Sequence, residues 1–152
     1  MSSAADPYIT NADIEERLGS QAYVQLTDDD GDGIANVGVV NEARHGAMGE
    51  VNSYLAQRYD VPIKLSTHTE LAGLLKSVCL DLVEYSLRSR RPPVPDITAK
   101  RREQAVHWLK GVANGSIHLP SDTPIASNTT RGTIASAVGS ERLLSRDALD
   151  EF

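Results

Sequence analysis

The sequence of 152 residues has few cysteines and aromatics, with one cysteine, one tryptophan and one phenylalanine. The single cysteine, Cys79, excludes an internal disulfide and suits a reducing cytoplasm. No apolar stretch approaches the roughly 20 residues that a membrane-spanning helix needs, so we expect no membrane partner. The N-terminal segment MSSAADPYITN lacks the charged and apolar regions of a secretory signal. We therefore expect a cytoplasmic protein with a mostly aliphatic core.

The motifs of common enzyme classes are also missing. There is no Gly-rich phosphate loop, nucleophile elbow or CxxC pair, and the histidines lack metal-ligand spacing. Cys79 lies in the most apolar segment, which favours a small core residue over a nucleophile. Asp81 and Glu84 could form an acid–base pair, but Glu84 also precedes Arg88 by four residues, the favoured spacing for a helix ion pair. We expect no catalysis and no cofactor.

The strongest pattern in the chain is helical. Between Leu71 and Leu87, apolar side chains recur at spacings of three and four and cover most of the helix circumference. Thr69 can cap the start, and Pro92 and Pro93 prevent continuation. This pattern predicts a buried central helix over about 69–91. Its main apolar positions are Leu71, Leu74, Leu75, Val78, Leu82 and Tyr85.

Weaker periodic patterns predict further helices on both sides of this one. Together they predict an all-α fold, a small helical bundle formed by residues 1–119. Gly46 and Gly49 lie inside one predicted helix, where they permit either a close approach by another helix or local flexibility. Ile97 is predicted to face the core from the last helix. The predicted ranges are residues 11–18, 20–26, 37–59 and 96–113.

The C-terminal part has a different composition. Residues 120–139 consist mainly of Ser, Thr, Ala, Gly, Asn and Pro, which cannot bury enough surface to offset the entropy of ordering. The last residues become apolar again. One interpretation is an extended C-terminal arm, residues 120–152, that docks on another molecule; the alternative is a frayed tail whose end folds back. The expected docking residues are Leu143, Leu144, Arg146, Leu149 and Phe152.

Charge is unevenly distributed along this chain, which has a formal net charge of −6. Residues 1–60 hold 11 acidic and 3 basic side chains, whereas residues 61–152 hold 10 acidic and 12 basic ones. These halves could be two differently solvated regions. Alternatively, an acidic face on one copy contacts a basic face on the next, as in a head-to-tail ring. The basic residues from Arg88 to Arg102 lack interleaved aromatics, which favours a protein interface over a DNA-binding site.

The segment TDDDGDG, residues 27–33, is called the acidic loop below. Asp28, Asp30, Asp32 and Gly33 match positions one, three, five and six of an EF-hand calcium loop. The match fails at the twelfth position, where Val39 replaces the bidentate glutamate. Two interpretations follow: a weak Ca²⁺ or Mg²⁺ site formed by the three aspartates, or a solvated acidic turn.

Six segments carry a resemblance over nearly the whole chain: YITNADIEERLG, QLTDDDGDG, VNSYLAQRYDVPI, LLKSVCLDLVEYSL, WLKGVANGSIHL and LSRDALDEF. Their order and spacing resemble the Mu-like bacteriophage and prophage neck proteins, a family of head–tail connector or adaptor proteins. The resemblance implies a helical virion protein that forms a dodecameric ring beneath the portal and contacts another neck or tail-completion protein. It also implies that the C-terminal arm grips the portal and that DNA passes through the channel without specific binding.

Two other functions remain as alternatives. One is a calcium-responsive helical binding module that uses Asp28, Asp30 and Asp32. The other is a small hydrolase that uses Asp81 and Glu84, which requires a solvent-filled pocket beside the central helix.

Overall fold

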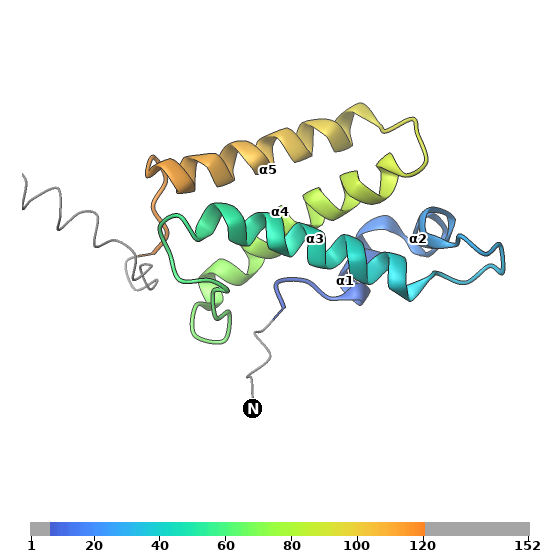
Figure 1. Ribbon diagram of the computed structural model, residues 1–152, viewed down its shortest axis with the longest axis horizontal. Coiled ribbons are helices and arrows are strands. Elements are labelled where there is room, and N and C mark those ends of the chain that lie inside the picture. Colours follow the sequence, from blue (N-terminus) through green and yellow to red (C-terminus); the bar gives the residue numbers. More distant parts are fainter. Residues whose placement is uncertain (1–6, 121–152) are drawn as a thin grey trace, which may run out of the picture.

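The computed structural model describes residues 7–120, whose regular elements are five α-helices (Figure 1). The predicted all-α fold is confirmed. No helix within the described range is long and apolar enough to cross a membrane. The helices are α1 (Asn11–Leu18), α2 (Ser20–Thr27), α3 (Val37–Leu55), α4 (Thr69–Ser89) and α5 (Asp96–Asn114).

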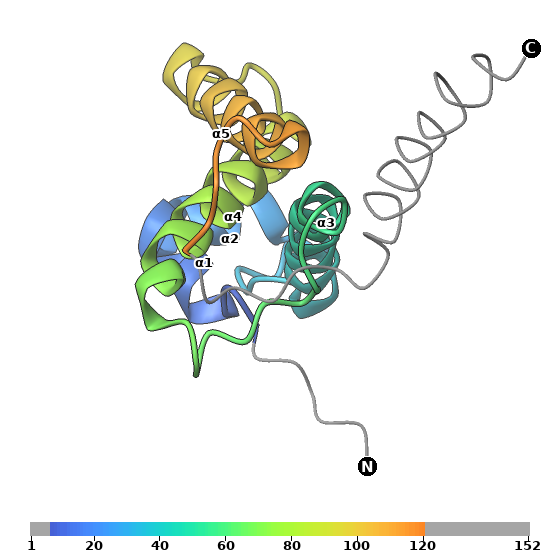
Figure 2. The same ribbon diagram turned by 90° about the vertical axis from the view of Figure 1, so that its left-hand side faces the viewer.

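Helix α4 forms the centre of the bundle, as its apolar pattern predicts. It packs against each of the other four helices, and Figure 2 shows it between α5 on one side and α1 and α2 on the other. Helix α3 also contacts all the others, but it buries four residues where α4 buries nine. Leu75, Cys79 and Leu87 are completely inaccessible to solvent. Cys79 is therefore a core residue, and burial raises the pKa of its thiol to about 12.

A capping box and a glycine define the start of α1 and the boundary between α1 and α2. Thr10 and Asp13 form a capping box at the start of α1: the Thr10 hydroxyl accepts from the Asp13 N–H at 3.2 Å, and the Asp13 carboxylate accepts from the Thr10 N–H at 2.8 Å. Gly19 separates α1 from α2 with a φ of 83°, a conformation that glycine adopts without strain. The chain therefore changes direction within one residue.

Two predicted helix boundaries are wrong, one by four residues and the other by one. Helix α3 ends at Leu55 instead of near Tyr59, although Tyr59 is still buried after the intervening turn. Its hydroxyl accepts a hydrogen bond from the Leu119 N–H at 3.0 Å. Thr69 is the first residue of α4 and His68 occupies the cap position, without a side-chain cap bond.

Two residues predicted to face the core are exposed. Leu74 is 41% exposed because it lies about 100° around α4 from the fully buried Leu75, on the side that faces away from the bundle. Ile97 is 56% exposed in the first turn of α5. The neighbouring Pro93 and Pro95 are exposed as well, whereas the adjacent Thr98 is buried, so Ile97 points away from the bundle.

Candidate interaction surfaces

The acidic loop is an ordered turn organised by one carboxylate. The side chain of Asp28 accepts hydrogen bonds from the backbone N–H groups of Gly31 at 2.7 Å, Gly33 at 2.9 Å and Asp32 at 3.3 Å. The Asp32 carboxylate accepts in turn from the Ile34 N–H at 3.0 Å. Gly31 and Gly33 have φ values of 75° and 77°, which explains why glycines occupy these positions.

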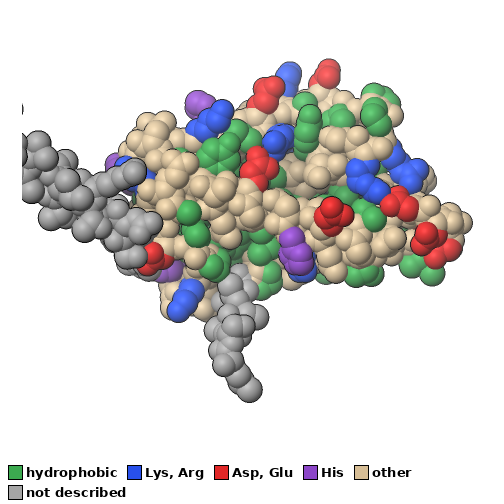
Figure 3. Space-filling model, viewed as in Figure 1, with side chains coloured by type: hydrophobic (Ala, Val, Ile, Leu, Met, Phe, Trp, Pro, Cys, Tyr) green, Lys and Arg blue, Asp and Glu red, His purple; other side chains and the backbone are tan. Residues whose placement is uncertain are grey.

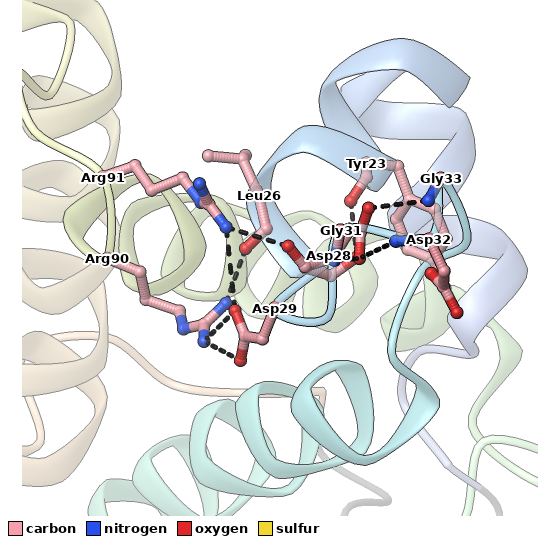
Figure 4. A network of polar contacts seen from close by, with 10 residues as sticks. Tyr23, Leu26, Asp28, Asp29, Gly31, Asp32, Gly33, Arg90 and Arg91 are labelled. Carbon is pink, nitrogen blue, oxygen red and sulfur yellow. Dashed lines mark hydrogen bonds and ion pairs between the residues drawn. The ribbon is translucent and has the colours of Figure 1, made fainter.

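The end of α4 clamps this loop to the bundle. Arg90 donates to the Leu26 carbonyl at 2.6 Å and to both carboxylate oxygens of Asp29, at 2.9 and 2.7 Å (Figure 4). Arg91 donates to the Asp28 carbonyl at 2.9 Å. Arg90 Nη2 contacts both oxygens of Asp29 while its Nη1 binds the Leu26 carbonyl, so one guanidinium holds the loop at two points. Arg90 and Arg91 therefore hold a segment that lies about 60 residues earlier in the chain.

The three predicted metal-binding aspartates of the acidic loop make different hydrogen bonds in the structure. The Asp28 oxygens already bind three backbone N–H groups, and Asp32 binds a fourth. Among residues 7–120, no group of three or more histidine, cysteine or acidic side chains is arranged to hold a metal ion. The site formed by Asp28, Asp30 and Asp32 remains a prediction that a titration with Ca²⁺ can test.

The hydrogen bonds to Asp28 predict a pH-dependent turn. The N–H of Gly33 foremost, with those of Gly31 and Asp32, stabilises the charged carboxylate and lowers its pKa below the ordinary 3.8. The contribution of Asp28 to stability is therefore complete above the ordinary value and is lost as the pH falls through the lowered pKa. We expect the Gly31 and Gly33 amide resonances to shift with a midpoint below 3.8 in an NMR titration. Asp28→Asn should abolish the transition, and a midpoint at or above the ordinary value would contradict the structure.

Glu84 lies at the centre of an ion-pair network that joins three helices. Its side chain is only 6% exposed, and its oxygens lie 3.0 Å from Arg88 Nε, 3.2 Å from Arg17 Nε and 3.8 Å from Arg101 Nη1. Arg17 also pairs with Asp81 at 2.5 Å. The predicted Glu84–Arg88 ion pair is confirmed. Arg17 and Arg101 are partners that helical spacing did not reveal, because they come from α1 and α5.

A groove of ≈ 640 Å³ runs between α3, α4 and α5. Its α3 wall includes the small residues Ala43, Gly46 and Ala47, and a Cβ at Gly46 would meet no atom of a neighbouring element within 4 Å. Gly49 is equally open, so neither glycine permits a close helix approach within the described structure. Arg102 bounds the groove: its guanidinium lies 5.1 Å from the centre of the Tyr85 ring and 3.3 Å from Glu50. The groove leaves one face of α3 uncovered.

The expected docking residues of the C-terminal arm, Leu143, Leu144, Arg146, Leu149 and Phe152, lie outside the described residues. The structure does describe Leu119, which directly precedes the predicted arm. Leu119 is 7% exposed, and its N–H is bound by the buried hydroxyl of Tyr59. Tyr8 acts similarly near the other end, because its hydroxyl donates to Asn52 at 2.6 Å and accepts from the Ile63 N–H at 2.9 Å.

Residues 7–120 form a small bundle of five helices in which several arginines bind the other helices and the acidic loop. A protein-family model described as Bacteriophage Mu, Gp36 matches residues 8–137, and the chain belongs to that family. It is a Mu-like phage protein of a structural or morphogenetic kind. The predicted resemblance to Mu-like phage proteins is thus confirmed at the level of the family. No curated protein and no solved structure matches the chain.

Proposed function

We propose that this protein is a structural component of a Mu-like phage virion, a head–tail connector without catalytic activity or cofactor. Copies form a head-to-tail ring, dodecameric as the resemblance implies, between the portal and the next neck or tail component. The protein is made in the host cytoplasm and resides in the neck of the virion. The observation that carries the proposal is membership of the Mu Gp36 family over residues 8–137.

The way the arm leaves the helical bundle supports its role as a tether to the portal. Tyr59 is 7% exposed and holds the Leu119 N–H, and Leu119 itself packs in the core. A force on the arm would therefore act on the buried Tyr59–Leu119 hydrogen bond and on the packing of Leu119, and not on the end of α5. Because the arm is attached to the bundle at a defined point, each copy in a ring would present its arm at the same position.

The charge of the protein suits a channel for DNA. The formal net charge is −6, and binding to DNA depends mainly on neutralising phosphates with basic side chains. Several arginines are already paired with carboxylates, among them Arg17, Arg88 and Arg90. A ring built from this protein would let DNA pass without holding it.

Removal of the C-terminal apolar segment tests the proposed function. We expect a chain that ends at Gly139, expressed from the phage genome, to abolish attachment to filled heads and reduce infectious particles by about a thousandfold or more. Electron microscopy should show filled, tailless heads without the protein. Within the full-length chain, Leu149→Asp should act in the same direction, because a charge replaces an expected apolar anchor.

The matched control is Thr129→Asp, which adds the same charge in the polar stretch between bundle and arm end. It should leave the particle yield within about threefold of the wild type, since the sequence around Thr129 has few apolar residues that a charge could displace from a contact. Circular dichroism of each purified chain shows whether the helical bundle is retained. Infectious, tailed particles assembled from the truncated chain would disprove the tethering role of the arm.

Calorimetry separates this proposal from the calcium-responsive module. We expect no heat from Ca²⁺ binding with a Kd tighter than about 1 mM, because three backbone N–H groups already bind the Asp28 carboxylate and a bidentate glutamate is missing. Asp30→Asn is the matched variant, since it removes a predicted ligand without affecting the turn. Micromolar binding that Asp30→Asn abolishes, accompanied by a change in helical structure, would favour the calcium-responsive module.

A further inference from the structure

The most exposed large apolar side chains of the described structure lie next to the acidic loop. Ile34 is 68% exposed and Val37 is 60% exposed. Their base is rigid, because Asp28 organises the turn and Arg90 clamps Asp29 to the end of α4. Asp30 is also exposed and makes no ion pair with any residue in the range 7–120. This projection, Ile34 and Val37 with Asp30, is called the acidic knob below.

A second surface is complementary to the acidic knob, because it is concave and carries a basic side chain. A hollow of ≈ 430 Å³ lies against α5, with Tyr85, Ala99 and Val106 among its apolar lining residues. Lys110 lines the same hollow, is exposed and has no ion pair within the described part of the chain. One acid, Glu103, also lines it. Arg102 lines it as well, so basic side chains outnumber acidic ones. This surface is called the α5 hollow, and it offers an apolar floor beside the exposed ammonium group of Lys110.

The two surfaces lie on different parts of the molecule. Figure 1 shows α5 along one edge of the molecule and the loop between α2 and α3 at one end, and Figure 3, in the same view, shows acidic and hydrophobic side chains at that end. A contact between two unlike patches is heterologous, and repeating it generates a ring or an open helix rather than a closed dimer. Such a contact would place the acidic half of one copy beside the basic half of the next.

We propose that the acidic knob of one copy docks into the α5 hollow of a second copy. Ile34 and Val37 enter the hollow beside Val106, and Asp30 pairs with Lys110. Charge complementarity sets the direction of the contact, and burial of the two exposed aliphatic side chains stabilises it. The inference rests on the proposed ring and names the surfaces that form it.

Engineered cysteines in the full-length chain test the contact. Ile34→Cys and Val106→Cys are purified as two separate variants, mixed at low salt and oxidised with glutathione disulfide. A disulfide requires Cα atoms within about 7 Å, so it reports proximity directly. The native Cys79 is buried and will not compete. We expect the cross-linked dimer in the mixture to exceed that of either variant alone by at least about tenfold.

Leu74→Cys is the matched control, because Leu74 is also exposed but belongs to neither surface. Mixing it with Ile34→Cys should give only the background yield. Equal yields with Leu74→Cys and with Val106→Cys, or no excess with Val106→Cys, would overturn the proposal. The cross-link uses only residues of the described bundle, so it is independent of the arm. Loss of particle assembly on truncation therefore tests the proposed function separately.

A charge exchange tests the direction of the contact. Lys110→Glu in the Val106→Cys chain should return the cross-linking yield to background, because it places two acids opposite each other. Asp30→Lys in the Ile34→Cys chain should then restore the yield. Circular dichroism of each variant confirms that the helices are intact. A yield that Lys110→Glu leaves unchanged, or that the second substitution does not restore, would overturn the pairing of the two surfaces.

Discussion

Replacing Glu84 by glutamine is expected to lower the free energy of unfolding by about 3 kcal/mol. The carboxylate is 6% exposed and is the shared partner of Arg17, Arg88 and Arg101, which come from three different helices. An amide of the same shape removes the negative charge and leaves the three guanidinium groups close together. The arginine side chains are 25–43% exposed and can partly turn to water, so we expect a value near the low end for a broken buried ion pair.

Urea unfolding of the full-length chain, followed by circular dichroism, measures this loss. Glu103→Gln is the matched control, because it makes the same chemical change at an exposed position of α5. It should alter the free energy of unfolding by less than about 0.5 kcal/mol. Equal effects of the two substitutions would mean that the network around Glu84 does not hold α1 and α5 to α4.

Two adjacent leucines of α4 should respond very differently to replacement by alanine. Leu75 is 0% exposed, and Leu75→Ala should cost about 3–4 kcal/mol, through lost apolar burial and the cavity left behind. Leu74 is 41% exposed, and Leu74→Ala should cost less than about 1 kcal/mol. The residue type, the helix and the change in helix propensity are the same in both, so the difference isolates burial.

The same urea experiment applies to both variants. A shift in midpoint without a change in slope would show that only stability has changed. If Leu74→Ala proved as destabilising as Leu75→Ala, a surface covering Leu74 in solution would be required. Repeating the measurement across protein concentrations would then show whether a second copy provides that cover.

The apolar periodicity of α4 identified the centre of the bundle from sequence alone. A helix with apolar residues on most of its circumference must be covered on several sides, and α4 packs against each of the other helices. The same pattern could not separate Leu74 from Leu75. Exposure depends on which directions the neighbouring helices leave open, and spacing along one helix does not contain that information.

The acidic loop also combines features that the sequence predicts with features that only the tertiary structure shows. Its glycines and aspartates predicted a sharp turn, because positive φ values and Asx-type hydrogen bonds are local properties. The clamp formed by Arg90 on Asp29 joins residues 61 positions apart. No local rule selects that partner among the arginines that follow α4. It becomes visible only when α2 and the end of α4 lie side by side.

The amino-acid sequence alone determined the helical class, the central helix, the turn in the acidic loop and the resemblance to Mu-like phage proteins. Each depends on short-range spacing or on the order of segments along the chain. The tertiary structure decided which arginines surround Glu84, how the acidic loop is clamped, and where Ile34 and Val37 remain exposed. These features arise where residues distant in sequence meet, and their energies depend on distances and burial that only the packed helices establish.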